Sequence, residues 1–226
     1  MKVVPLLFRV GHGWSADLPA SLDGPSTVAF VFGVPDVADD PALRAALRGL
    51  RHAFRRSILV GCSTAGEIHG TRIYDRSFSV AIAHFEHARA AFASAPVAAD
   101  RSFDAGERIA RELWKPDLRS VHVFSDGLDI NGSELVRGLN SVLPADVVAT
   151  GGLAGDGSRF ARTWALEHGI PTQHVVTAVG LYGDSVHAGH GSRWGGDDLG
   201  PERRVTRSVA NVLYELDGKT PLELYK

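Results

Sequence analysis

The stretch SILVGCSTAGEI, residues 57–68, combines the two signals on which the prediction of the fold rests. Its first four residues are a short apolar run without alternation, which is typical of a strand covered on both faces. A glycine-rich segment follows at once and indicates that the chain turns where this strand ends. The stretch also holds the chain's only cysteine, Cys62, and an acid, Glu67. It therefore predicts a buried strand whose carboxyl end carries chemically useful side chains.

A strand and a helix precede this stretch in the order of a crossover unit. Residues 27–32 form another apolar run, and Asp40-Pro41 supplies an N-cap and a first-turn proline for a helix over 41–55. Two strands joined by such a helix are expected to be parallel neighbours in one sheet. Two further strands over 78–93 complete this first unit.

The same order of elements recurs roughly 90 residues later, which indicates an internal repeat. The second unit consists of strand 121–124, helix 131–142, strand 147–150, a glycine turn over 151–157 and two strands over 174–193. We therefore predict an α/β fold. Its mixed sheets are built from two repeated β-α-β-β units, about residues 25–95 and 118–195, with helices packed on the outer faces.

Length, charge and cysteine content limit the function classes. The 226 residues, 44% of them hydrophobic, suffice for a domain with a real core, and we expect a single domain over 1–226. A net charge of −2 argues against nucleic acid or an anionic membrane as a partner. The densest basic spot, Arg51-His52 with Arg55-Arg56, suits the carboxyl end of a helix. One cysteine, and no visible signal peptide or apolar membrane span, predict a cytoplasmic protein without membrane insertion.

A ligand site is expected where the carboxyl ends of the parallel strands meet, beside the amino end of the second helix. The candidate residues lie at these strand ends, in the two glycine turns and at that helix start: Gly61, Cys62, Ser63, Thr64, Glu67, Ser125, Asp126, Gly127, Asn131, Gly151, Gly152, Gly155, Asp156 and Arg159. Asp126 or Glu67 is expected to take an amino group, and the helix start or Arg159 a carboxylate. Each residue also has a structural interpretation, as a turn former, a helix cap or half of a surface ion pair.

Two other functions remain open at this point. One is an enzyme that uses Cys62 in acyl or thiol chemistry, although no Cys/His signature lies near it and a small buried cysteine is the alternative. The other is an interaction module without a pocket. No phosphate-binding glycine loop is present. The pairs His84/His87 and His187/His190 lie in strand-like segments, where residues three apart face opposite sides and cannot readily share a metal. We therefore assign no cofactor, no metal and no catalytic residue.

Four motifs in this order resemble the FIST N-terminal domain. They are GCSTAGEI at 61–68, SDG at 125–127 with NGSEL at 131–135, GGLAGDG at 151–157, and VTRS at 205–208 followed by NVLYELDG at 211–218. The similarity runs from about residue 25 to the end of the chain. The segment before strand 27–32 is shorter than is usual in that family.

The resemblance implies a bacterial intracellular sensory domain for signal transduction that binds small ligands such as amino acids. It also implies a signalling output as partner. The family pattern continues into a C-terminal FIST domain, so residues 205–226 are expected to begin such a domain or to link to it.

Overall fold

The computed structural model describes residues 1–191 and 200–225, which fall into two compact units, Met1–Gly189 and His190–Lys226. The first unit holds three α-helices, two short 3-10 helices and thirteen strands among its described residues. Their bounds are β1 Lys2–Arg9, β2 Gly13–Trp14, η1 Ala20–Leu22, β3 Thr27–Gly33, α1 Pro41–Ala53, β4 Ile58–Ser63, β5 Glu67–His69, β6 Arg72–Tyr74, β7 Ser77–His84, β8 Arg89–Pro96, η2 Ala99–Arg101, α2 Ser102–Leu113, β9 Leu118–Ser125, α3 Gly132–Asn140, β10 Val148–Leu153, β11 Ala165–Glu167, β12 Ile170–Thr172 and β13 Val175–Tyr182.

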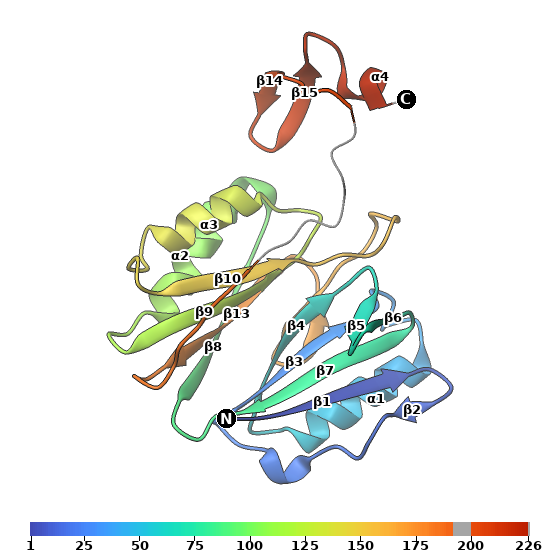
Figure 1. Cartoon of the computed structure of the whole chain (residues 1–226), viewed down its shortest axis with the longest axis vertical. Helices are drawn as coiled ribbons and strands as arrows, with labels where there is room; N and C mark the ends of the chain where they lie inside the picture. Colours follow the sequence, from blue (N-terminus) through green and yellow to red (C-terminus); the bar gives the residue numbers. More distant parts are fainter. Residues whose placement is uncertain (192–199, 226) are drawn as a thin grey trace. The chain divides into compact units, whose positions relative to one another are not determined.

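Most of these strands form two mixed sheets (Figure 1). The first has the order β12-β11-β4-β3-β7-β1-β2 and the second has the order β10-β9-β13-β8. In the first sheet β3 and β4 are parallel, and in the second β9 and β10 are parallel, as expected for strands joined by the crossover helices α1 and α3. The other main strands pair antiparallel. The predicted class, an α/β fold with mixed sheets, is confirmed.

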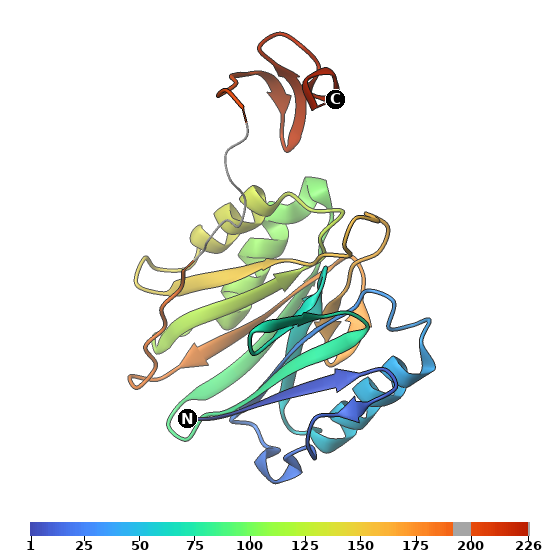
Figure 2. The same cartoon turned by 45° about the vertical axis from the view of Figure 1, so that its right-hand side comes forward.

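The two sheets lie face to face, with helices on both outer sides. Figures 1 and 2 show α1 on one side of the pair, and α2 and α3 on the other. Between the sheets, Phe32 packs edge-on against Phe124 at 5.8 Å between ring centroids, beside the fully buried Val179. All eight residues of β13 are buried, because a sheet covers one face of this strand and helices cover the other.

The start of α1 is fixed by the residues that predict it. Asp40 Oδ1 accepts hydrogen bonds from the backbone N–H of Ala42 at 2.8 Å and of Leu43 at 3.4 Å, and Pro41 occupies the first turn. Leu47 and other apolar residues at helical spacing then bury one face of the helix against the first sheet. The second crossover helix is capped by Asn131, whose Oδ1 accepts from Glu134 N at 3.3 Å.

Three details differ from the sequence analysis. Strand β8, which the prediction assigns to the first unit, pairs with β13 over eight residues and belongs to the second sheet. The predicted strand over 186–193 is absent from residues 186–191, and its last two residues lie outside the described part of the chain. Strand β4 continues to Ser63 instead of ending at Val60. The boundaries of the two repeated units stay a prediction.

The second compact unit contains a hairpin of β14 Val205–Val209 and β15 Val212–Leu216, followed by the short helix α4 Pro221–Tyr225. Arg207 Nε lies 2.7 Å from Glu215 Oε1 across this hairpin. The expectation that residues 205–226 lead into a further domain stays a prediction. Among the described residues of the whole chain, no helix combines the length and the apolar character needed to cross a membrane.

Candidate functional site

A cavity of about 700 Å³ opens at the carboxyl ends of β3 and β4, beside the start of α1. Such an edge of parallel strands is where open α/β sheets bind ligands. Five segments supply its wall: the residue after β1, the β3–α1 connection with the first turn of α1, the β4–β5 turn with the start of β5, the β6–β7 turn and the loop after β10. The lining residues are Val10, Val34, Pro35, Asp36, Asp39, Asp40, Pro41, Leu43, Thr64, Ala65, Gly66, Glu67, Asp75, Arg76, Asp156, Gly157 and Arg159.

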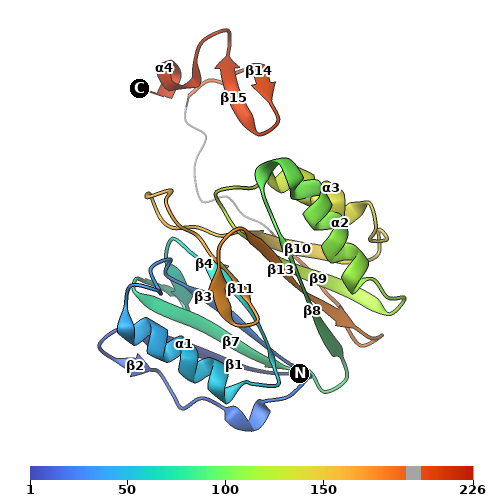
Figure 3. The same ribbon diagram turned by 180° about the vertical axis from the view of Figure 1, so that it is seen from behind.

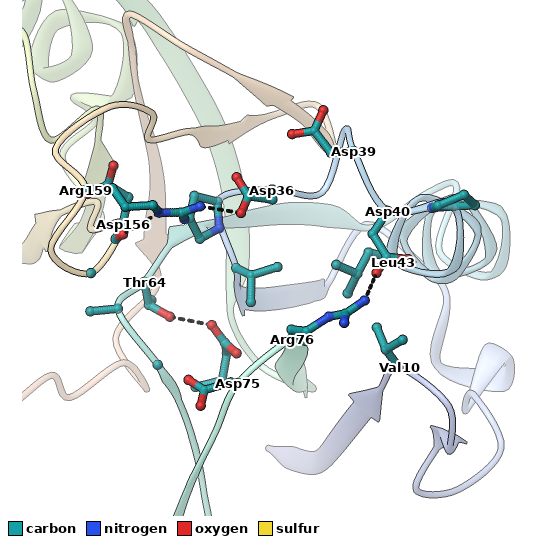
Figure 4. Close-up of a pocket in the computed structure, with 17 residues that line it drawn as sticks. Val10, Asp36, Asp39, Asp40, Leu43, Thr64, Asp75, Arg76, Asp156 and Arg159 are labelled. Carbon is teal, nitrogen blue, oxygen red and sulfur yellow. Dashed lines mark hydrogen bonds and ion pairs between the residues drawn. The ribbon is translucent and has the colours of Figure 1, made fainter.

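The wall of this cavity is strongly acidic. It carries six acidic side chains and only two basic ones, Arg76 and Arg159. Arg159 forms an ion pair with Asp36, and Arg76 Nη2 lies 2.7 Å from Asp40 Oδ2 (Figure 4). The Arg76 guanidinium lowers the pKa of Asp40, and Asp36 raises the pKa of Arg159. A third arginine, Arg162, lies 2.8 Å from Asp39 Oδ2. The wall acids without an ion pair among the described residues are Glu67, Asp75 and Asp156, so the excess charge that faces a ligand is negative.

Glu67 is the most deeply placed acid of the cavity, with 1% of the residue exposed. Its Oε1 accepts a hydrogen bond from Thr64 Oγ1 at 2.9 Å, and its Oε2 accepts one from Ser77 Oγ at 2.6 Å. Burial raises the pKa of Glu67, and the nearby Asp75 adds to this increase, whereas the two hydroxyls act against it. A positively charged ligand group beside Glu67 would therefore favour its ionised form.

Asp156 also lines the cavity, but its carboxylate accepts hydrogen bonds from the backbone of its own loop. Its two oxygens accept from the backbone N–H groups of Phe160, Ala161 and Arg162 at 3.1, 2.7 and 2.9 Å. These hydrogen bonds lower the pKa of Asp156, and the bonds from Arg162 N and Ala161 N have the largest effect. Its acceptor capacity is largely used inside the loop, so Asp156 shapes the wall that presents Arg159.

The two glycine turns meet, as the sequence analysis expects for one shared edge. Gly155 N donates to Ser63 O at 2.9 Å, which joins the segment after β10 to the end of β4. The chain then enters the first sheet at β11. Here Trp164 N donates to Ser63 Oγ at 3.1 Å, and Trp164 O accepts from Ser63 N at 2.9 Å. The loop that carries Arg159 is thus fixed at both ends to β4.

Of the fourteen candidate residues, Thr64, Glu67, Asp156 and Arg159 line the cavity. Gly61, Cys62 and Ser63 do not, because β4 continues three residues beyond the expected end and holds them inside the sheet. Gly151 and Gly152 likewise lie within β10, which pairs with β9 up to Leu153. A ligand-binding role for these five residues stays a prediction that the geometry does not favour.

The candidate residues between 125 and 131 contribute to the structure around the second sheet. Asp126, only 2% exposed, accepts from the backbone N–H of Leu128 at 2.8 Å and of His174 at 3.1 Å. Gly127 N donates to Thr163 Oγ1 at 3.0 Å, and Asn131 caps α3. Ser125 is fully buried. Neither these four residues nor Gly155 line the cavity.

Four acids and an arginine of the cavity wall are absent from the candidate residues that the sequence predicts. Asp36, Asp39 and Asp40 follow β3 directly, so the rule of strand carboxyl ends applies to them as well, yet only the capping role of Asp40 was predicted. Asp75 and Arg76 lie in the β6–β7 turn. No local signal points to these two residues, because the chain brings them to the cavity only after the β5–β6 hairpin, outside the crossover unit.

Cys62 lies in the contact between the sheets, 6% exposed, and its Cα is paired with Ala165. Burial raises the pKa of its thiol to about 12. Because the thiolate is the reactive species, alkylation by iodoacetamide at pH 7.5 should be at least about 100-fold slower in the folded than in the urea-unfolded chain. Mass spectrometry of timed samples measures both rates. A folded rate equal to or above the unfolded one would contradict this and revive a nucleophilic Cys62.

The described residues contain no group of three or more His, Cys, Asp or Glu side chains arranged to hold a metal ion. Fold and site together define a mixed α/β domain with an open, acidic cavity at the carboxyl ends of parallel strands. A family model of the FIST N domain matches residues 27–219, and the chain therefore belongs to this family, which comprises sensory domains of signal transduction. The comparison with curated proteins gave no significant match.

Proposed function

We propose that this chain is a cytoplasmic bacterial sensory domain that binds a small amine, with amino acids as the leading class, in the acidic cavity. The observation that carries the proposal is the excess of acidic over basic side chains in a concave site of about 700 Å³. This volume lies in the range of small-molecule sites, and a negative wall selects a protonated amino group. Sensing through a bound metabolite agrees with membership of the FIST family.

The amino group is assigned to the side of the cavity formed by Glu67 and Asp75. Asp75 is exposed and forms no ion pair with any residue in the described part of the chain, so its carboxylate is available to a cation. Glu67 adds a buried acceptor, and the Thr64 hydroxyl that bonds to it lies at the same place (Figure 4). A second anionic group on the ligand, such as an amino-acid carboxylate, is assigned to Arg159, which would exchange part of its contact with Asp36.

The two alternative functions receive less support. An enzyme based on Cys62 requires an accessible thiolate, whereas this thiol is buried, has a raised pKa and lies outside the cavity. A module without a pocket fits poorly with a cavity whose wall is assembled from five chain segments. A C-terminal FIST domain and a signalling output remain the proposed partners.

The proposal is tested by measuring thermal unfolding and calorimetric binding with alanine, lysine, putrescine and acetate. Lysine and at least one other amine should stabilise the protein, by roughly 2.7 kcal/mol at 100 times the dissociation constant, and acetate should not. The affinity should rise from pH 5 to pH 7.5, because the raised pKa of Glu67 keeps part of that group neutral at the lower pH. The absence of binding by all three amines would overturn the proposal.

Two variants test whether the amine binds in this cavity. Asp75→Asn should weaken binding of the amine about tenfold or more, which corresponds to losing roughly 1.4 kcal/mol. Asp146→Asn is the matched control, since Asp146 is an exposed acid outside the cavity wall. Equal weakening in both variants would mean that overall charge governs binding, and would contradict the assignment to this cavity.

A further inference from the structure

A second concave site lies at the opposite end of β4, and its charge is the reverse of the first. This cavity measures about 610 Å³ and is bounded by the second half of α1, the start of β4, strand β8 and the β11–β12 turn. Figure 3 shows α1 on this side of the first sheet, near β4 and β11. The polar and aromatic side chains of its wall include Arg48, Arg51, His52, Arg55, Phe92 and His168.

The described wall of this cavity contains no acidic side chain. Arg48, Arg51 and Arg55 are exposed, and none forms an ion pair with a carboxylate in the described part of the chain. Residues 41–56 contain five arginines and no acid, in a chain whose formal charge is −2. Two acids lie beside the wall, and both accept hydrogen bonds. Glu167, next to His168 in sequence, accepts from Ser94 Oγ, and Asp23, far away in sequence, accepts from Ser57 Oγ and from the backbone N–H of Arg56.

The arginines are arranged so that their charges repel. Arg48 and Arg51 are spaced by three residues within α1, which places them side by side on one face of the helix, and like charges at this spacing are destabilising. Arg55 lies two residues beyond the end of α1 and lines the same cavity. A favourable interaction with the helix dipole accounts for cations in the last turn only. Arg48 lies one turn earlier, so the dipole explains the cations at the end of the helix but not the whole cluster.

Arg55 Nη2 lies 3.0 Å from His52 Nε2 within the wall. Two further contacts involve the β11–β12 turn. A Cβ atom at Gly169 would lie 3.0 Å from Arg51 Cγ, so the stem of this arginine packs on the β11–β12 turn. On the other side, the rings of Phe92 and His168 lie 4.5 Å apart between centroids. The cavity therefore combines guanidinium groups with an aromatic surface.

We propose that this basic cavity binds a small molecule that carries two or more phosphate groups. Guanidinium groups bind phosphate through paired hydrogen bonds, and three of them match a multiply charged anion better than a single carboxylate. The volume leaves space for an organic part of the ligand against Phe92 and His168. Nucleic acid fits less well, because the cluster is confined to one concave site on a helix of thirteen residues.

The full chain is titrated by calorimetry and thermal unfolding with pyrophosphate, ADP and inorganic phosphate at low ionic strength. Pyrophosphate and ADP should bind and raise Tm, and inorganic phosphate should bind at least tenfold more weakly. Arg51→Gln and Arg55→Gln should each weaken pyrophosphate binding tenfold or more. Arg55→Gln keeps the test informative if loss of the Arg51 packing loosens the fold.

Arg44→Gln is the matched control, because Arg44 belongs to α1 but lies outside this cavity. The affinity of this variant for pyrophosphate should differ less than twofold from that of the wild type. Equal losses in Arg44→Gln and Arg55→Gln, or no binding of pyrophosphate and ADP, would overturn the proposal. The proposal would also be overturned if a DNA duplex bound more tightly than pyrophosphate and if this binding were lost in Arg55→Gln. Because the amine site uses other residues, lysine binding should be unchanged in Arg55→Gln whichever outcome is found.

Discussion

Replacing Gly61 by alanine is expected to destabilise the domain by about 3 kcal/mol or more. Gly61 has φ +139°, a conformation that side chains other than glycine rarely adopt, and it lies in the middle of β4 opposite Val31. A Cβ atom there would lie 1.9 Å from Val31 O and 2.7 Å from Val31 C. These atoms belong to the backbone of the neighbouring strand β3, so the clash cannot be relieved by a side-chain rotation.

Urea denaturation followed by circular dichroism measures this effect, with Gly49→Ala as the matched control. Gly49 lies in α1 with free space where a Cβ would be, and alanine at such a helical position stabilises by roughly 0.5–1 kcal/mol. The same substitution is thus expected to have opposite signs at the two glycines. A Gly61→Ala protein with the unfolding midpoint of the wild type would contradict the close approach of β3 and β4.

Sequence patterns predict the fold class well, because most of its signals are local. The N-caps Asp40 and Asn131 start the crossover helices, and the short apolar runs 27–32 and 58–60 lie within the parallel strands β3 and β4. Gly61 shows the limit of this reasoning. A glycine after an apolar run predicts a turn, whereas here it permits two strand backbones to approach closely inside the sheet. That requirement depends on the partner strand, which a local pattern does not contain.

The sequence pattern selects only part of the cavity wall, for a related physical reason. The rule of strand carboxyl ends points to Thr64 and Glu67, which line the cavity, and their role in binding stays a prediction. It also points to Asp126, which the second sheet uses internally to accept backbone hydrogen bonds. An acid at the end of a strand either faces a cavity or satisfies backbone N–H groups. Which of the two applies depends on the tertiary path of the following loop.

Trp164 is the residue on which that path depends, and no sequence pattern marks it. It is 2% exposed, packs in the core between α1 and the first sheet, and its Nε1–H donates to Val34 O at 3.0 Å. Val34 belongs to the cavity wall. One side chain therefore holds the β3–α1 connection against the loop that carries Arg159. The shape of the acidic cavity follows from this contact between residues 130 positions apart in sequence.

Trp164→Ala is consequently expected to cost about 3–5 kcal/mol of stability, the usual range for removing a buried aromatic ring. It should also weaken amine binding, because Val34 and the loop of Arg159 lose their common anchor.

Trp164→Phe should retain most of the stability while losing the hydrogen bond to Val34 O. Trp14→Ala is the control, since Trp14 is half-buried beside Phe8 and should cost roughly 1–2 kcal/mol without affecting binding. Urea denaturation and calorimetry measure both properties. Equal losses at Trp164 and Trp14 would show that Trp164 contributes only apolar area, and that another contact holds the cavity together.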